Sequence, residues 1–170
     1  MPTRQSTLHT SAPARSKSGQ RGTATDALEL LHTDHQQVED LFAQFEKART
    51  ADRKEKLASQ ICSELKVHTQ VEEELFYPAA REALRNGDLL DEATVEHGSA
   101  KALIEQIEAS GPQESLFDAT VMVLSEYIKH HVNEEENELF PQLRETDLDL
   151  VALGEALSER KNVLMQKIAR

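Results

Sequence analysis

Several residue types that direct a chain toward particular protein classes are scarce here. The 170 residues include one cysteine and no tryptophan. A lone cysteine cannot form an internal disulfide, which favours a reducing compartment, so we expect a cytoplasmic protein whose Cys62 packs in the core. The sequence contains no stretch of about 18 consecutive apolar residues, so it predicts no membrane-spanning helix.

Motifs of common enzyme classes are also missing. The sequence has no Gly-rich phosphate-binding loop and no Ser-His-Asp or Cys-His nucleophile set, so it does not decide whether the protein is an enzyme. It also lacks the alternation of apolar and polar residues that is typical of strands. The absence of strand patterns predicts an all-α fold.

Acidic residues are absent from the first 25 positions, but they outnumber basic residues in the rest of the chain. Residues 1–25 carry four basic side chains, so a net charge of −12 for the whole chain leaves −16 on residues 26–170. The first segment is poor in apolar residues, and we predict a disordered basic tail there, with docking to anionic partners as the alternative role. The acidic body argues against nucleic acid as a partner.

What the chain does have is an internal repeat. His68 and Glu72 open the run HTQVEEELFYP, and 63 residues later His131 and Glu135 open HVNEEENELFP. A further histidine precedes each run, by 33 residues in the first case and 34 in the second. A histidine and a glutamate four positions apart lie on one face of a helix, where both can reach one metal ion.

The apolar spacing predicts helices over about 26–47, 52–84, the segment between Gly87 and Gly111, 113–144 and 147–168. Pro78 and Pro141 should kink the ends of the second and fourth helices. Two such hairpins cannot bury their apolar faces alone. We therefore expect one domain, with an up-down-up-down four-helix bundle over 26–145 and an additional C-terminal helix within 146–170. Expected apolar positions include Leu75 and Ala79 of the second helix and Val163 of the fifth.

Six polar residues fall on the inward faces of the four bundle helices. Burying two carboxylates with no lysine or arginine on those faces would cost several kcal/mol unless a cation compensates them. The alternative is a set of hydrogen-bonded core residues. Imidazole and carboxylate ligands without thiolate suit iron, manganese or zinc, and bridging carboxylates would favour a dinuclear iron or manganese centre. The candidate ligands are His35, His68, Glu72, His97, His131 and Glu135.

Other polar residues near these positions are expected to lie outside the site. His32 and His130 are one step off the inward faces and should be boundary residues or contact the ligands from behind. The remaining acidic residues of the two motifs should be solvated, unless a distorted turn near either proline brings Glu73 or Glu136 inward. These acidic residues are Glu73, Glu74, Glu134, Glu136 and Glu138.

From Asp26 to Arg144 the chain resembles the hemerythrin-like, or HHE cation-binding, domain family. The motifs that carry the resemblance are LLHTDHQQVEDLF, HTQVEEELFYP, VEHGSAKALI and HHVNEEENELFP. The resemblance implies a bundle that holds two non-heme iron ions through the six candidate ligands, with the glutamates as bridges. It also implies binding of O2, peroxide or nitric oxide for sensing or stress protection, or alternatively iron storage and handling without redox chemistry.

The chain departs from the oxygen-carrying members of that family at one position. Lys101 stands where they have a second histidine, one turn after the histidine of the third helix. A charged ammonium group cannot ligate a metal, but it could stabilise an anionic ligand at an open coordination position. The alternative is that Lys101 extends to solvent along the edge of the bundle.

Overall fold

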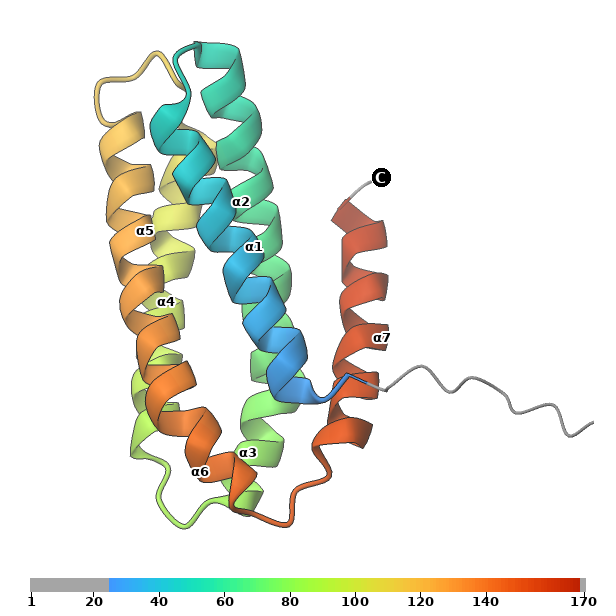
Figure 1. Ribbon diagram of the computed structural model, residues 1–170. Coiled ribbons are helices and arrows are strands. Elements are labelled where there is room, and N and C mark those ends of the chain that lie inside the picture. The colour runs from blue at the N-terminus through green and yellow to red at the C-terminus, as the bar shows by residue number, and fades with distance from the viewer. Residues whose placement is uncertain (1–24, 169–170) are drawn as a thin grey trace, which may run out of the picture.

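The computed structural model describes residues 25–168, and all its regular elements are helices (Figure 1). The all-α prediction is confirmed, whereas the predicted basic tail lies almost entirely outside the described residues. Among the helices of the described part, none is long and apolar enough to cross a membrane. The elements are α1 (Ala27–Lys47), α2 (Ala51–Val71), the π-helix η1 (Glu72–Phe76), α3 (Tyr77–Ala83), α4 (Asp88–Ala109), α5 (Phe117–Glu134), the π-helix η2 (Glu135–Leu139), α6 (Phe140–Arg144) and α7 (Leu150–Ile168).

The four long helices form an up-down-up-down bundle, as predicted (Figure 1). Short loops join α1 to α2 and α4 to α5, so the members of each pair are antiparallel and pack together. The two pairs meet where α1 packs against α5 and α2 packs against α4. Capping side chains fix the starts of the first pair: an Asp26 carboxylate oxygen accepts from the Glu29 amide at 2.9 Å, and the Thr50 hydroxyl accepts from the Arg53 amide at 3.3 Å.

The apolar core of the bundle is divided into two clusters. One contains Leu28, Leu31 and Phe76, together with residues of α6 and α7. The other contains Phe42, Ile61 and their neighbours toward the opposite end of the bundle. Cys62 belongs to this second cluster and is 1% exposed, in agreement with the predicted core role. A layer of buried histidines and glutamates lies between the two clusters.

The C-terminal helix α7 packs outside the bundle against α1 and α2 (Figure 1). Gly154 permits this close approach, because a Cβ atom there would lie 2.5 Å from the Thr25 carbonyl oxygen. Leu157 and Leu164 are seven positions apart and bury the same face of α7. Val163 is 45% exposed, so its predicted core position was wrong. It lies about 100° around the helix from Leu164, toward solvent.

Both helices that carry the repeated motif are interrupted by a π-helix, which the sequence reading did not predict. Each π-helix begins at the motif glutamate, and Pro78 and Pro141 follow in the first turns of α3 and α6. A π turn holds one extra residue and so shifts the inward face by one position. Phe76 and Ala80 are consequently fully buried in place of the expected Leu75 and Ala79. The predicted start of the fourth helix at 113 was also early, because α5 begins at Phe117.

Candidate metal centre

The six candidate ligands meet midway along the bundle, and none is more than 5% exposed. The histidines form two pairs, one from each half of the repeat. The Nε2 atoms of His35 and His68 are 3.2 Å apart, and those of His97 and His131 are also 3.2 Å apart. Nitrogen atoms about 2.1 Å from one ion and about 100° apart around it would be separated by about 3.2 Å. The pairs therefore have the spacing of neighbouring ligands on a metal ion.

The two glutamates lie between the histidine pairs. Glu72 Oε2 is 3.2 Å from His68 Nε2 and 3.3 Å from His97 Nε2. Glu135 Oε2 is 3.4 Å from His35 Nε2 and 3.7 Å from His131 Nε2. Each carboxylate thus contacts one histidine from each half of the chain, which is the placement that a bridging ligand requires.

These carboxylates are not satisfied by hydrogen bonds. Three of their oxygen atoms have no hydrogen-bond partner within residues 25–168, namely both oxygens of Glu72 and Oε2 of Glu135. Both side chains are almost fully buried. The histidine nitrogen atoms are close to them but not in hydrogen-bonding geometry. An uncompensated buried carboxylate is costly, and a cation would remove that cost. The donor atoms lie within 4.8 Å of one another in two groups that share Glu72: His35, His68, Glu72 and Glu135, and Glu72, His97 and His131.

Behind each histidine lies a further carboxylate, facing the Nδ1 atom. Glu136 is 2.8 Å from His35 Nδ1, and Glu73 is 3.1 Å from His97 Nδ1. Our prediction that Glu73 and Glu136 are solvated was therefore wrong. Each is the second residue of a π-helix, and the extra residue of the π turn rotates it toward the neighbouring hairpin. A hydrogen bond at Nδ1 leaves Nε2 free for a metal and fixes the orientation of the ring.

Two more carboxylates complete this pattern, and the sequence reading missed both. Glu96 is 2.8 Å from His131 Nδ1, and Asp34 is 3.7 Å from His68 Nδ1. The repeat carried a signal for them, because Asp34 and Glu96 each directly precede a candidate ligand histidine, His35 or His97. Each acidic residue faces the histidine of the adjacent helix in its own hairpin, so only the packed hairpin reveals its role.

Each of these four carboxylates also contacts a basic or imidazole side chain farther out. Lys161 Nζ of α7 is 2.5 Å from Asp34, and the imidazoles of His32 and His130 contact Glu136 and Glu96. Lys101 Nζ is 2.6 Å from both oxygens of Glu73. The ammonium of Lys101 is therefore held by the carboxylate behind His97, while 45% of the side chain is exposed at the edge of the bundle.

The acidic surroundings shift the protonation of the candidate ligands. Burial by itself would lower the pKa of His35, but the adjacent carboxylates of Glu135 and Glu136 and the charge of Glu72 raise it to about 10. Burial would raise the pKa of Glu135, but His35, His131 and His68 lower it to about 2. Protons thus compete with a cation for His35.

Tyr77 is another residue of this site that the sequence reading missed. Its side chain is 5% exposed, and its hydroxyl donates to Glu135 Oε1 at 2.9 Å. The Tyr77 hydroxyl oxygen is also 3.1 Å from His97 Nε2. Burial and the nearby carboxylates Glu72 and Glu135 raise the pKa of Tyr77 well above its usual value. The second repeat has Phe140 at the equivalent position, so the phenol distinguishes the two halves of the site.

Comparison with known proteins agrees with this fold. Residues 26–143 match the family described as Hemerythrin HHE cation binding domain. A DNA nickase from Nostoc sp. strain PCC 7120 is 31% identical over 116 residues, which cover 68% of this chain but only 33% of that protein. The crystal structure of a Hemerythrin HHE cation binding domain-containing protein from Mycobacterium kansasii has a TM-score of 0.72 at 23% identity, covering 84% of this chain and 88% of that one. This chain belongs to the hemerythrin HHE cation-binding domain family.

Proposed function

We propose that this protein holds two iron ions in a non-heme site and binds O2, or a related small ligand such as peroxide or nitric oxide, for sensing or stress protection. The six proposed ligands are His35, His68, Glu72, His97, His131 and Glu135. The observation that carries the proposal is the set of three buried carboxylate oxygens that accept no hydrogen bond within residues 25–168 and face four histidine nitrogens.

The surrounding residues prepare the ligand atoms. Glu136 and Glu73 accept hydrogen bonds from the Nδ1 atoms of His35 and His97, which directs their Nε2 lone pairs inward. Glu72 and Glu135 supply two negative charges to offset positive charge at the centre. The Tyr77 hydroxyl fixes one oxygen of Glu135. Iron would supply reversible redox chemistry and coordination positions for a small ligand.

The donor set also suits manganese or zinc. A second function follows if the bound metal does not take part in redox chemistry. In that alternative the protein stores or handles iron, or uses its metal for stability, without redox chemistry. A nucleic-acid partner is not part of either proposal, because residues 26–170 carry a formal charge of −16.

Metal analysis of protein purified without added metal tests the first step. We expect about two iron ions per chain, with loss of iron in His68→Gln and none in His130→Gln, whose imidazole is 63% exposed. Purified protein that contains zinc or no metal would contradict the iron proposal.

Exposure of the reduced protein to O2 tests the second step. A change in the near-ultraviolet and visible charge-transfer bands is expected for a redox-active iron centre. An iron-loaded protein whose spectrum does not respond to O2, peroxide or nitric oxide would favour the storage alternative.

A further inference from the structure

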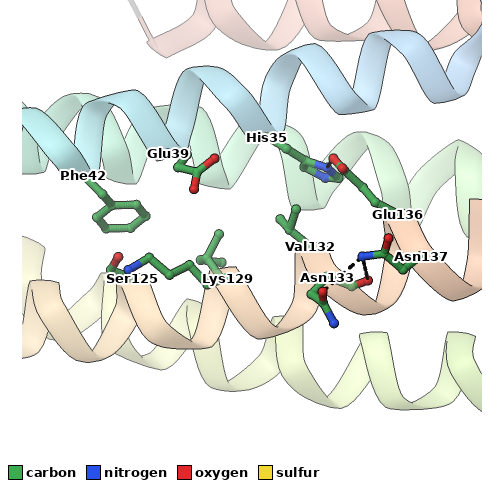
Figure 2. A pocket seen from close by; sticks show the side chains of 10 residues that line it. His35, Glu39, Phe42, Ser125, Lys129, Val132, Asn133, Glu136 and Asn137 are labelled. Carbon is green, nitrogen blue, oxygen red and sulfur yellow. Dashed lines mark hydrogen bonds and ion pairs between the residues drawn. The ribbon is translucent and has the colours of Figure 1, made fainter.

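A pocket of about 250 Å³ lies in the seam between α1 and α5. Figure 2 shows His35, Glu39 and Phe42 of α1 on one side of it, with Ser125, Lys129, Val132 and Asn133 of α5 on the other. At one end, Glu136 reaches across the seam to the ring of His35 (Figure 2). The outer pocket, as we call it, therefore ends beside one of the proposed metal ligands.

A second, inner cavity of about 10 Å³ lies inside the bundle. It is the size of about one water molecule. All four proposed ligand histidines border it, and Val38 and Leu65 make part of its apolar wall. Three residues line both spaces: His35, Ile128 and Val132.

Of the three residues that line both spaces, Val132 has the most exposed side chain. Ile128 is 8% exposed, whereas Val132 is only partly buried and contacts the outer pocket. The repeat places Thr69 at the corresponding position of the other half, where it is 1% exposed and its hydroxyl donates to the Lys66 carbonyl oxygen at 3.3 Å. The two seams of the bundle therefore differ, and the α1–α5 seam has the more accessible side chain.

The chemistry of the outer pocket favours uncharged molecules. Glu39 and Glu136 place two carboxylates around it, and the ammonium of Lys129 is 2.9 Å from Glu126. Such a surface repels small anions. Ser125 Oγ also borders this pocket, is fully buried and has no hydrogen-bond partner within residues 25–168. It is a polar atom that a small ligand could satisfy.

We infer that the outer pocket is the access route by which a small uncharged ligand reaches the metal centre, with Ile128 and Val132 as the gate to the inner cavity. This inference rests on the proposed function and adds to it the route and the preference for neutral ligands over anions. The ligand class comprises molecules of O2, nitric oxide or hydrogen peroxide size, because only about one water volume is open behind the gate.

Stopped-flow binding of nitric oxide to the anaerobic, reduced holoprotein tests the gate. Val132→Trp should bind about tenfold more slowly, which corresponds to about 1.4 kcal/mol of added barrier, and Val132→Ala should bind faster than wild type. The matched control is Val123→Trp, because Val123 is on the same helix, is 47% exposed and lines neither space. Equal rates in all four proteins would overturn the inference. If Val132→Trp does not fold, an unchanged rate in Val132→Ala decides against it.

Xenon provides a readout that does not depend on the metal. Crystals of the purified protein under xenon pressure should show xenon against Ile128 and Val132 in wild type and none there in Val132→Trp, because xenon enters apolar cavities. Absence of xenon from the wild-type seam would overturn the route. Xenon in the seam without nitric oxide binding would leave the route standing and count against the proposed function, so the two failures are distinguishable.

Discussion

The free energy of unfolding of the metal-free protein should decrease as the pH rises, because of His35. The pKa of His35 is raised to about 10 in the folded chain, against an ordinary value of 6.5, mainly through Glu135 and Glu136 and against the effect of burial. A raised pKa stabilises the fold fully below pH 6.5, and the stabilisation is lost as the pH rises through 10. The raised pKa of His131 acts in the same direction.

The size of the effect follows from proton linkage. When the folded chain holds one proton that the unfolded chain does not, the free energy of unfolding decreases by about 1.4 kcal/mol for each unit that the pH rises. Between about pH 7 and about pH 9 the decrease is about 3 kcal/mol. For a protein of this size that corresponds to a decrease in Tm of about 6–12 °C. In the metal-loaded protein His35 must be neutral to offer Nε2, so this slope should vanish.

Metal binding to the native state alone adds about 4 kcal/mol at a thousandfold excess over Kd, so the loaded protein should melt higher throughout. The gap in Tm between loaded and chelated protein should widen from about pH 7 to about pH 9. Thermal melts followed by circular dichroism at several pH values measure both slopes. His130→Gln should leave the contribution of His35 to the slope of the chelated protein unchanged, and His35→Gln should remove that contribution. A chelated wild type with a flat Tm over this range would refute the reasoning.

Three further predictions concern single side chains. Glu72→Gln should release both metal ions together, because Glu72 Oε2 is 3.2 Å from His68 Nε2 and 3.3 Å from His97 Nε2; metal analysis that finds one ion retained per chain would count against a bridging carboxylate. Tyr77→Phe should fold normally but shift the charge-transfer bands and lose metal faster to a chelator, since it removes the hydrogen bond to Glu135; an unchanged spectrum and release rate would show that the phenol does not act on the site. Lys161→Met should destabilise the fold by about 2 kcal/mol in urea melts, because it leaves the Asp34 carboxylate, which is 8% exposed, without its ammonium partner. The double variant with Asp34→Asn should recover most of that loss, and failure to recover it would assign the effect to lost packing of α7.

The sequence by itself determined the bundle and the six inward-facing residues. His68 and Glu72 are four positions apart on an apolar face, and the copy 63 residues later has the same spacing. This information is local, because the period of the helix decides which residues share a face. Packing the two halves against each other then brings all six residues together.

Only the tertiary structure decided what surrounds those residues. The π turns rotate Glu73 and Glu136 across to histidines of the other hairpin, and an average helical period cannot reveal one extra residue in a turn. Tyr77 reaches His97 and Glu135, and Lys161 reaches Asp34, across 20, 58 and 127 positions of sequence. Such contacts depend on how separate helices pack, as does the pocket between α1 and α5, because a pocket is the space that several elements leave between them.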